Sequence, residues 1–161
     1  MISIYSERIT VSPSEIDVLG HVNNQVYLKW MERVATNHAA ANGWPYSRLV
    51  EHSYMWVAKR HWLEYIKSAF EGEEITLHTW VQGLRGAGCL RRYAFVRDSE
   101  EIFIGATEWA FLDAARMRPM IVPDVVKNSF EIISPDDPRL AELGIGRRIR
   151  FAPSAAFMEQ K

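Results

Sequence analysis

The stretch 17-DVLGHVNN-24, followed directly by 25-QVYLKWME-32, decides the predicted fold of this 161-residue chain. It places the acid Asp17, the turn-forming Gly20 and the asparagines Asn23 and Asn24 within eight residues. Glycine permits a turn that other residues resist, and asparagine is a preferred N-cap. From residue 25 to about residue 41 there is no Pro or Gly, and apolar residues recur at three- and four-residue spacing. The pattern predicts a helix over residues 25–41 with a broad apolar face.

An acid beside a helix start suggests a specific chemistry. The first turn of a helix has backbone N–H groups without partners, and these favour negative charge. A carboxylate at Asp17 could attack a carbonyl carbon, or direct water at it, while the carbonyl oxygen accepts from those N–H groups. These are the minimum parts of an acyl-transfer or hydrolysis site. The alternative is a capped helix preceded by a turn in which Asp17 and His21 are ordinary polar residues.

The rest of the chain predicts a sheet. Alternating apolar and polar residues between turn signals predict strands over residues 2–11, 53–66, 73–83, 89–97 and 102–113. A glycine-rich turn is expected over residues 83–88, and a short helix over residues 123–130, begun by Pro123. The order of one strand, one helix and then four strands predicts an α+β arrangement, an antiparallel sheet wrapped around a central helix.

The length fits one domain, which we expect to span residues 1–133, with residues 134–161 as an irregular C-terminal extension of unknown role. The net charge is −1, from 19 basic and 20 acidic residues, so no overall field attracts nucleic acid or an anionic membrane. No signal peptide or membrane-spanning run is expected, and the single Cys89 fits a reducing compartment. We therefore expect a cytoplasmic protein without nucleic-acid or membrane partners.

The string Asp-x-x-Gly-His-Val-Asn-Asn-x-x-Tyr-Leu resembles the signature of hot-dog-fold thioesterases of the 4-hydroxybenzoyl-CoA thioesterase-like group. It is also similar to the corresponding stretch of acyl-ACP thioesterases. The resemblance covers about residues 2–122 and implies the hot-dog fold. It further implies that Asp17 is the nucleophile or general base and that the backbone N–H of Asn24 is the oxyanion donor. The family usually has a second Asp where this chain has Glu15, for which we expect only hydrogen bonds within the loop.

Other residues near this stretch are candidates for smaller roles. His21 could protonate the departing thiolate or orient Asp17, although a hydrogen-bonding scaffold is favoured. Gly20, Asn23 and Tyr27 are candidate substrate-binding residues, with capping of the helix the favoured role for the Asn23 side chain. Glu32, a helix acid about two turns further on, is the alternative catalytic acid. Its expected role is an exposed or interface ion pair.

A CoA substrate carries phosphates, so basic residues should line the mouth of the site. Arg91 and Arg92 are the candidates chosen from the basic residues on predicted strands and turns, which are Lys59, Arg60, Arg85, Arg91 and Arg92. Four tryptophans are candidates either for lining an acyl cavity or for plain core packing: Trp30, Trp56, Trp62 and Trp109.

The function that follows is hydrolysis of an acyl-CoA thioester to a free acid and CoA, with water as the second substrate. We expect no cofactor, and the spacing of the five histidines predicts no metal site. The alternatives are an acyl-ACP thioesterase and a non-catalytic hot-dog protein that binds acyl thioesters. An exposed strand edge invites pairing with another copy, so we expect a homodimer or homotetramer with Asp17 near an interface.

Overall fold

The computed structural model describes residues 1–150 and 153–157, and an antiparallel sheet forms its centre. The sheet contains β1 (Ile4–Thr10), β2 (Tyr54–Tyr65), β3 (Glu74–Arg85), β4 (Gly88–Arg97) and β5 (Glu100–Asp113), in the order β1-β3-β4-β5-β2. The two-residue β6 (Arg118–Pro119) pairs with β5. All of these pairings are antiparallel. The predicted sheet is confirmed.

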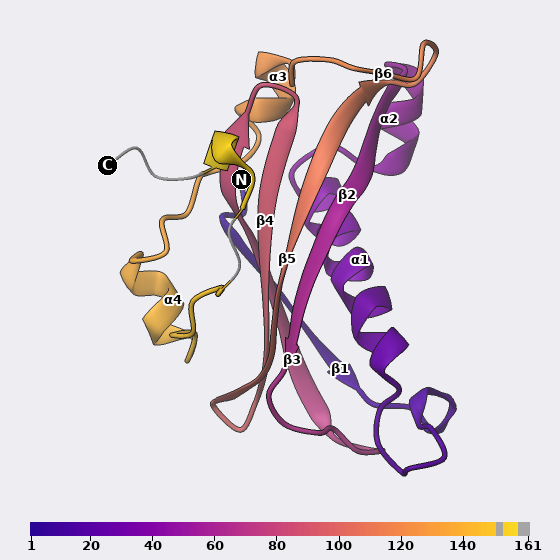
Figure 1. The fold of residues 1–161 in the computed structure, drawn as a ribbon, viewed down its shortest axis with the longest axis vertical. Helices are drawn as coiled ribbons and strands as arrows, with labels where there is room; N and C mark the ends of the chain where they lie inside the picture. Colours follow the sequence, from indigo (N-terminus) through magenta and orange to yellow (C-terminus); the bar gives the residue numbers. More distant parts are fainter. Residues whose placement is uncertain (151–152, 158–161) are drawn as a thin grey trace.

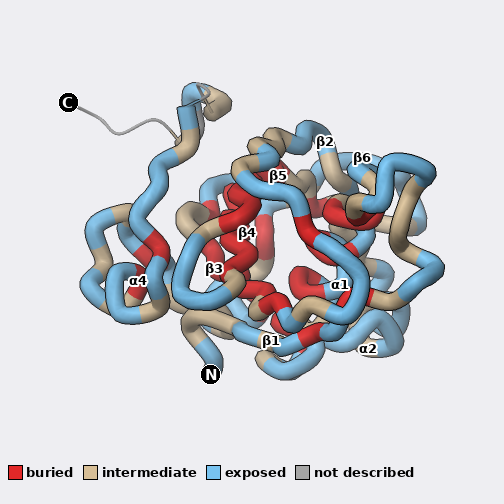
Figure 2. The backbone as a smooth tube through the Cα atoms, turned by 90° about the horizontal axis from the view of Figure 1, so that it is seen from below, coloured by how far each residue is buried: buried red, intermediate tan, exposed pale blue. Residues whose placement is uncertain are grey.

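The long helix α1 (Asn24–Ala41) lies across the inner face of the curled sheet (Figure 1). Its apolar stripe is buried, with Met31 and Val34 fully enclosed. Alternation along the strands places Tyr93 and Phe95 of β4 and Phe103 of β5 on the face toward α1, in the same core cluster as the helix. The buried segments gather where the helix meets β3, β4 and β5 (Figure 2). The predicted central helix is confirmed, including its start.

The turns and short helices differ from the sequence-based predictions. The expected turn over residues 83–88 is shorter: β3 continues to Arg85, and Gly86, with a φ of 56°, provides the tight reversal before β4. Gly83 lies instead at an irregularity in the pairing of β3 with β4. The predicted helix 123–130 is reduced to α3 (Asp124–Lys127), because the chain leaves helical geometry after its C-cap, Asn128.

Two helices were not predicted from the sequence. The first is α2 (Tyr46–Glu51), which begins directly after Pro45, its N-cap residue. Proline ends one helix and is equally compatible with the first turn of the next, so its position alone is ambiguous. The second is α4 (Pro138–Glu142), with Asp137 as its N-cap.

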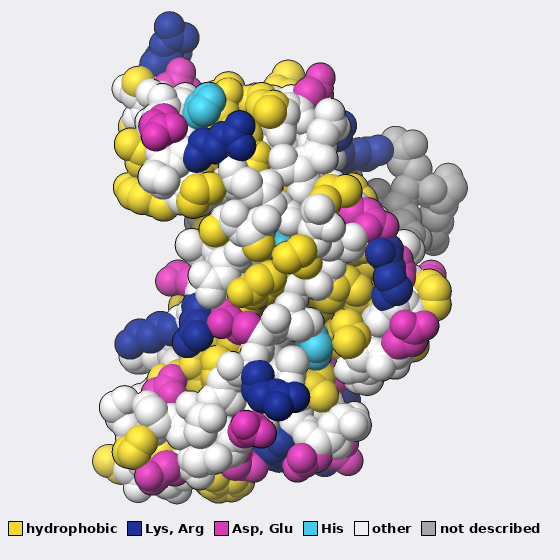
Figure 3. All heavy atoms as spheres, turned by 180° about the vertical axis from the view of Figure 1, so that it is seen from behind, with side chains coloured by type: hydrophobic (Ala, Val, Ile, Leu, Met, Phe, Trp, Pro, Cys, Tyr) yellow, Lys and Arg dark blue, Asp and Glu magenta, His cyan; other side chains and the backbone are white. Residues whose placement is uncertain are grey.

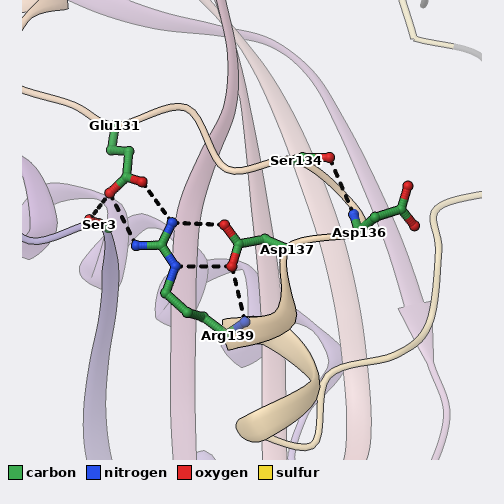
Figure 4. A network of polar contacts seen from close by, with 6 residues as sticks. All are labelled: Ser3, Glu131, Ser134, Asp136, Asp137 and Arg139. Atoms are coloured by element: carbon green, nitrogen blue, oxygen red, sulfur yellow. Dashed lines mark hydrogen bonds and ion pairs between the residues drawn. The ribbon is translucent and has the colours of Figure 1, made fainter.

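The C-terminal segment covers the outer face of the sheet. Ile133, Leu140 and Ile145 pack with residues that point outward from the strands, including Trp80 and Ile104. A polar network supports this contact (Figure 4): Arg139 bridges Glu131 and Asp137 at 2.6 and 2.7 Å, and Glu131 also accepts from Ser3, which precedes β1. Residues 131–145 thus form a cover over the sheet, although the sequence there lacks a regular pattern.

One face of the molecule shows no segregation of charge. On the face drawn in Figure 3, acidic and basic side chains are interspersed with hydrophobic ones. This agrees with the nearly balanced composition of the chain. No helix among residues 1–150 and 153–157 is long and apolar enough to cross a membrane.

Candidate active site

The Asp17 turn is a small hairpin held by its own backbone. An antiparallel bridge joins Ile16 to Val22, and the Asp17 N–H donates to the His21 carbonyl at 2.9 Å. Inside the turn, the Gly20 N–H donates to the Asp17 carbonyl at 3.1 Å. Gly20 has a φ of 81°, a conformation that glycine adopts without strain. These backbone hydrogen bonds therefore fix the position of the Asp17 Cα, from which the carboxylate extends.

The turn leads directly into the start of α1. Asn23 caps the helix, since its Oδ1 accepts from the Gln25 N–H at 3.0 Å, and capping is therefore confirmed. The Asn23 N–H donates to the Glu15 carbonyl at 2.8 Å. This hydrogen bond joins the helix start to the segment just before Asp17. The Asn24 N–H has no hydrogen-bond partner within the part of the chain that the structure describes. It is a free donor at the positive end of the helix dipole.

The Asp17 carboxylate accepts one hydrogen bond among the described residues. Its Oδ1 accepts from the Leu19 N–H at 2.9 Å, and neither oxygen takes part in an ion pair among the described residues. The side chain is partly exposed, and Val18 and Leu19 beside it are exposed apolar residues. A carboxylate with one oxygen free and a fixed backbone is able to meet a substrate without first breaking an ion pair.

His21 is anchored away from Asp17. Its ring meets the Phe70 ring edge-on at a centroid distance of 5.2 Å, and its Nδ1 lies 3.5 Å from the Ser68 Oγ. Within the described residues, no hydrogen bond joins the side chains of His21 and Asp17. The geometry favours the scaffold role, in which His21 holds the turn against residues 68–70.

Glu15 fastens the base of the turn to the helix. Its Oε2 accepts from the Trp30 indole N–H at 2.9 Å, and its Oε1 accepts from the Ser12 N–H at 2.9 Å. The expected loop hydrogen bonds of Glu15 are therefore present. Trp30 itself packs in the core, so it does not line the main cavity described below.

Tyr27 lies in the core beneath the helix start. It is 3% exposed, and its ring stacks on Phe103 at a centroid distance of 5.0 Å. Tyr65 of β2 meets the same ring edge-on and donates its hydroxyl to the Asn24 carbonyl at 3.0 Å. The structure thus gives Tyr27 a packing role, and contact with substrate remains a prediction for it. Sequence reasoning did not identify Tyr65, because this contact joins segments 41 residues apart.

Arg91 and Arg92 do not form the open basic groove that was expected. Both are buried, and adjacent strand positions point to opposite faces of the sheet. Arg91 lies on the inner face and donates to Nδ1 of His38 at 2.9 Å. Arg92 lies on the outer face, where it contacts Gln82 and the ring of Trp80, and burial lowers its pKa to about 10. Contact with phosphates in open solvent is therefore not supported for this pair.

A cavity of about 500 Å³ opens at the other end of α1. Its walls come from the second half of α1, from α2 and from the inner face of β2 to β5, and they include Trp44, Leu49, Tyr54, Trp56, Leu84 and Trp109. Of the four tryptophans considered, Trp56 and Trp109 line it, whereas Trp62 packs on the outer face of the sheet. Trp44 was missed because it follows the predicted helix in a stretch without periodicity.

Glu32 is exposed on α1 and faces a different neighbourhood from Asp17. Burial lowers the pKa of His61 on β2, and the nearby Glu32 carboxylate opposes that shift. The His61 Nδ1 lies 2.8 Å from the Thr107 hydroxyl. No helix start or free backbone donor accompanies Glu32, so its surroundings lack the oxyanion-binding feature found near Asp17. No group of three or more metal-binding side chains is arranged to hold a metal ion within the described ranges.

Comparisons with known proteins agree with this architecture. Residues 11–130 match the sequence profile of the thioesterase-like superfamily. Among solved structures, a hypothetical protein from Aquifex aeolicus is 20% identical with a TM-score of 0.73, covering 80% of this chain and 98% of that one. The DHNA-CoA thioesterase from Staphylococcus aureus is 19% identical with a TM-score of 0.69, covering 74% of this chain and 81% of its own.

A third solved structure is an acyl-ACP thioesterase from Bacteroides thetaiotaomicron, 22% identical with a TM-score of 0.70. The similarity covers 74% of this chain and 49% of that one. A sequence search of curated proteins found no match. The similarities of fold and profile confirm the hot-dog fold that the Asp17–Asn24 signature implied.

Proposed function

Since this chain belongs to the thioesterase-like superfamily, we propose that it hydrolyses an acyl thioester, with acyl-CoA as the substrate and the Asp17 turn as the active site. The observation that carries the proposal is the free N–H of Asn24 at the start of α1, two residues after the hairpin that holds Asp17. Together they supply an oxyanion donor and a carboxylate with one free oxygen.

The chemistry needs no group beyond water and these residues. The thioester oxygen accepts from the Asn24 N–H, and that donor stabilises the negative charge that develops on the oxygen. Loss of such a donor typically costs about 3 kcal/mol of transition-state stabilisation. In one route Asp17 takes a proton from water, the water oxygen bonds to the carbonyl carbon, the C–S bond breaks and the proton passes to the thiolate. In the other, Asp17 bonds to the carbon, the thiolate leaves, and water then hydrolyses the mixed anhydride.

The remaining members of the turn have supporting roles in this proposal. Gly20 lets the turn close without a side chain beside the substrate, and no atom lies within 4 Å of where a Cβ would stand. Asn23 sets the direction of the Asn24 N–H by capping the helix. His21 positions the turn against Phe70, with proton donation to the leaving thiolate as the alternative. A thiol is acidic enough to leave without strong protonation, which favours positioning.

We further propose a homodimer or homotetramer in which the site lies near an interface. Strands β1 and β2 are the two edges of the sheet, and β2 presents Val57, His61 and Tyr65 as exposed side chains. Unpaired strand edges with apolar residues favour pairing with another copy. We also propose a cytoplasmic location, because the only cysteine, Cys89, is a buried free thiol.

Two alternative functions are distinguishable by the same assay. The carrier could be an acyl carrier protein, which is acidic and would use basic residues on the surface rather than a phosphate site. The chain could also bind acyl thioesters without turning them over. The free oxygen of Asp17 favours turnover over binding alone.

A panel of acyl-CoA and acyl-ACP thioesters, assayed for thiol release by the purified protein, tests the proposal. We expect release from at least one acyl-CoA at a rate proportional to enzyme, with slower release from acyl-ACP of the same chain length. The reverse preference would identify the carrier as acyl carrier protein. Tight binding of acyl-CoA without thiol release across the panel would contradict the proposed activity.

A further inference from the structure

The cavity beside α2 is separate from the Asp17 turn within one protomer. On α1 it is lined by Ala35, Thr36 and Ala39, which lie eleven or more residues beyond Asn24. At the helical rise of 1.5 Å per residue, eleven residues correspond to about 16 Å. A volume of about 500 Å³ and a largely apolar lining with several aromatic rings fall within the usual range for sites that bind small molecules.

Among the described residues that line this cavity, one is charged, and it has no counter-charge within the described part of the chain. The Arg91 side chain, on the inner face of β4, is 5% exposed and lines the cavity. Its Nη1 donates to Nδ1 of His38 at 2.9 Å and to the hydroxyl of Thr79 at 3.2 Å. No carboxylate lies within ion-pair distance of Arg91 among the described residues. A buried charge without a partner is costly, so a ligand anion there would be strongly favoured.

The groups facing Arg91 are neutral at pH 7. Burial, assisted by the Arg91 charge, lowers the pKa of His38 to about 4, and its Nε2–H donates to the Ile2 carbonyl at 2.6 Å. Burial raises the pKa of Cys89 to about 11 and that of Tyr93 to about 12. None of these side chains can therefore act as the missing anion.

The unused part of the guanidinium has the geometry for a carboxylate. Both contacts with His38 and Thr79 use Nη1, so the edge formed by Nε and Nη2 has no hydrogen bond within the described residues. Among the described residues, neither of these nitrogens is a fully enclosed polar atom without a partner, and the Arg91 side chain lines the cavity. Two parallel N–H groups on one edge of an arginine match the two oxygens of a carboxylate.

We propose that this cavity binds a small molecule with an apolar or aromatic body and one carboxylate, and that Arg91 binds the carboxylate. The body lies among Trp44, Trp56 and Trp109, and the anion supplies the counter-charge that the described residues do not provide. Aromatic walls also suit a quaternary ammonium group, but the fixed positive charge of Arg91 opposes a cation. The carboxylate belongs either to a free acid or to the far end of an acyl group delivered as a thioester.

Calorimetric titration of the whole protein with 1-naphthylacetate and with its neutral amide, 1-naphthylacetamide, tests the proposal. We expect the acid to bind at least tenfold more tightly than the amide, since a hydrogen bond between two charged groups is stronger than one to a neutral amide. Equal affinity for acid and amide, or tighter binding of benzyltrimethylammonium than of the acid, would overturn the proposal. These comparisons use the unaltered protein and do not depend on a variant that folds.

Two variants locate the binding. Arg91→Met should remove the preference for acid over amide, whereas Arg97→Met is the matched control because it removes the same charge from the same strand outside the cavity. Ala39→Phe fills the cavity while keeping Arg91, and it should weaken binding of acid and amide alike. Retention of the preference in a folded Arg91→Met protein would contradict the assigned role of Arg91.

A kinetic arm, which rests on the proposed function, separates the two sources of the carboxylate. It compares kcat/KM for phenylacetyl-CoA with that for the same thioester carrying a 4-carboxylate on its ring. A preference for the carboxylated thioester that is lost in Arg91→Met assigns the carboxylate to the acyl group. Calorimetric binding without this preference assigns it to a free acid. Absence of hydrolysis of both thioesters would count against the proposed function, while the calorimetry would still decide the proposal about the cavity.

Discussion

Asp17 and Glu32 are both carboxylates near α1, but their surroundings differ. Asp17 lies within a bridged turn that leads into a helix start whose first N–H is free among the described residues, whereas Glu32 lies on the exposed side of the helix near His61. Thioester hydrolysis needs a donor for the developing oxyanion as well as an acid residue. We therefore assign the chemistry to the Asp17 turn and not to the helix acid Glu32.

The first prediction concerns Glu32→Gln. The substitution keeps the size of an exposed side chain and removes its charge, so kcat for the best acyl-CoA should stay within about threefold of the unaltered protein, as expected for a residue outside the reacting groups. Steady-state thiol release measures this. A loss of about 100-fold or more in a folded Glu32→Gln protein would move the catalytic acid from the turn to the helix.

The second prediction is a pH dependence of stability. Burial lowers the pKa of both His38 and His78 to about 4, from the ordinary histidine value of 6.5. Between pH 6.5 and 4 the unfolded chain binds protons that the folded chain does not. Stability should therefore be fully present above pH 6.5 and fall as the pH drops toward 4, by about 1.4 kcal/mol per pH unit for each histidine.

Urea unfolding at pH 7 and pH 5 measures this effect. His78→Asn keeps a polar group beside Ser6, whose hydroxyl lies 2.6 Å from the His78 Nδ1, and it should reduce the difference between the two pH values. Equal free energies of unfolding at pH 7 and pH 5 for the unaltered protein would show that these histidines titrate normally in the folded state.

Some of the local features of the site could be predicted from the sequence. The turn that contains Asp17 and the capping role of Asn23 both follow from local residue preferences. The inward position of Arg91 could also have been predicted. It lies two residues from Cys89 and Tyr93 on the strand and therefore shares a face with them and with Phe95, which are apolar or aromatic. Burial of Arg92 could not, since it depends on a C-terminal cover whose contacts with the sheet join distant parts of the chain.

Among the helices and strands, the start of α1 matters both for the stability of the fold and for the proposed active site. Asn23 is the only side chain that caps α1 within the described residues, through its bond to the Gln25 N–H. Our third prediction is that Asn23→Ala lowers the free energy of unfolding by about 1 kcal/mol, the usual loss for an N-cap. Chemical denaturation measures it, and Gln25→Ala, an exposed neighbour in the first turn, is the control. An equal loss in both variants would remove the capping bond as the cause.

The long elements were predictable, whereas the short ones were not. Strands and α1 have enough residues for periodicity to accumulate, and their order was sufficient for the α+β arrangement. The helices α2 and α4 have six and five residues, too few for a periodic signal. For α4 a usable signal was nevertheless present, because Asp137 followed by Pro138 is a favoured pair at the start of a helix.

At the scale of the whole molecule, the two faces of the sheet have different covers. The inner face holds α1 and the cavity, and the outer face is closed by residues 131–145. What stays open is the pair of sheet edges, β1 and β2. An edge strand offers unpaired backbone groups to another strand.

The fourth prediction is therefore that the protein is not a monomer in solution. Light scattering at micromolar concentration should give a mass at least twice the 18.6 kDa of one chain. A mass near 18.6 kDa across a range of concentrations would contradict the proposed assembly and would require the active site to be complete within one protomer.

The most direct test of the central claim is the turnover of Asp17→Asn on the best acyl-CoA substrate. Asparagine keeps the size and an accepting oxygen for the Leu19 N–H, while the free N–H of Asn24 is untouched. We predict that kcat falls by about 100-fold or more with KM roughly preserved, since the lost group acts on the chemical step. Near-native kcat in a folded Asp17→Asn protein would contradict the assignment of the Asp17 turn as the active site.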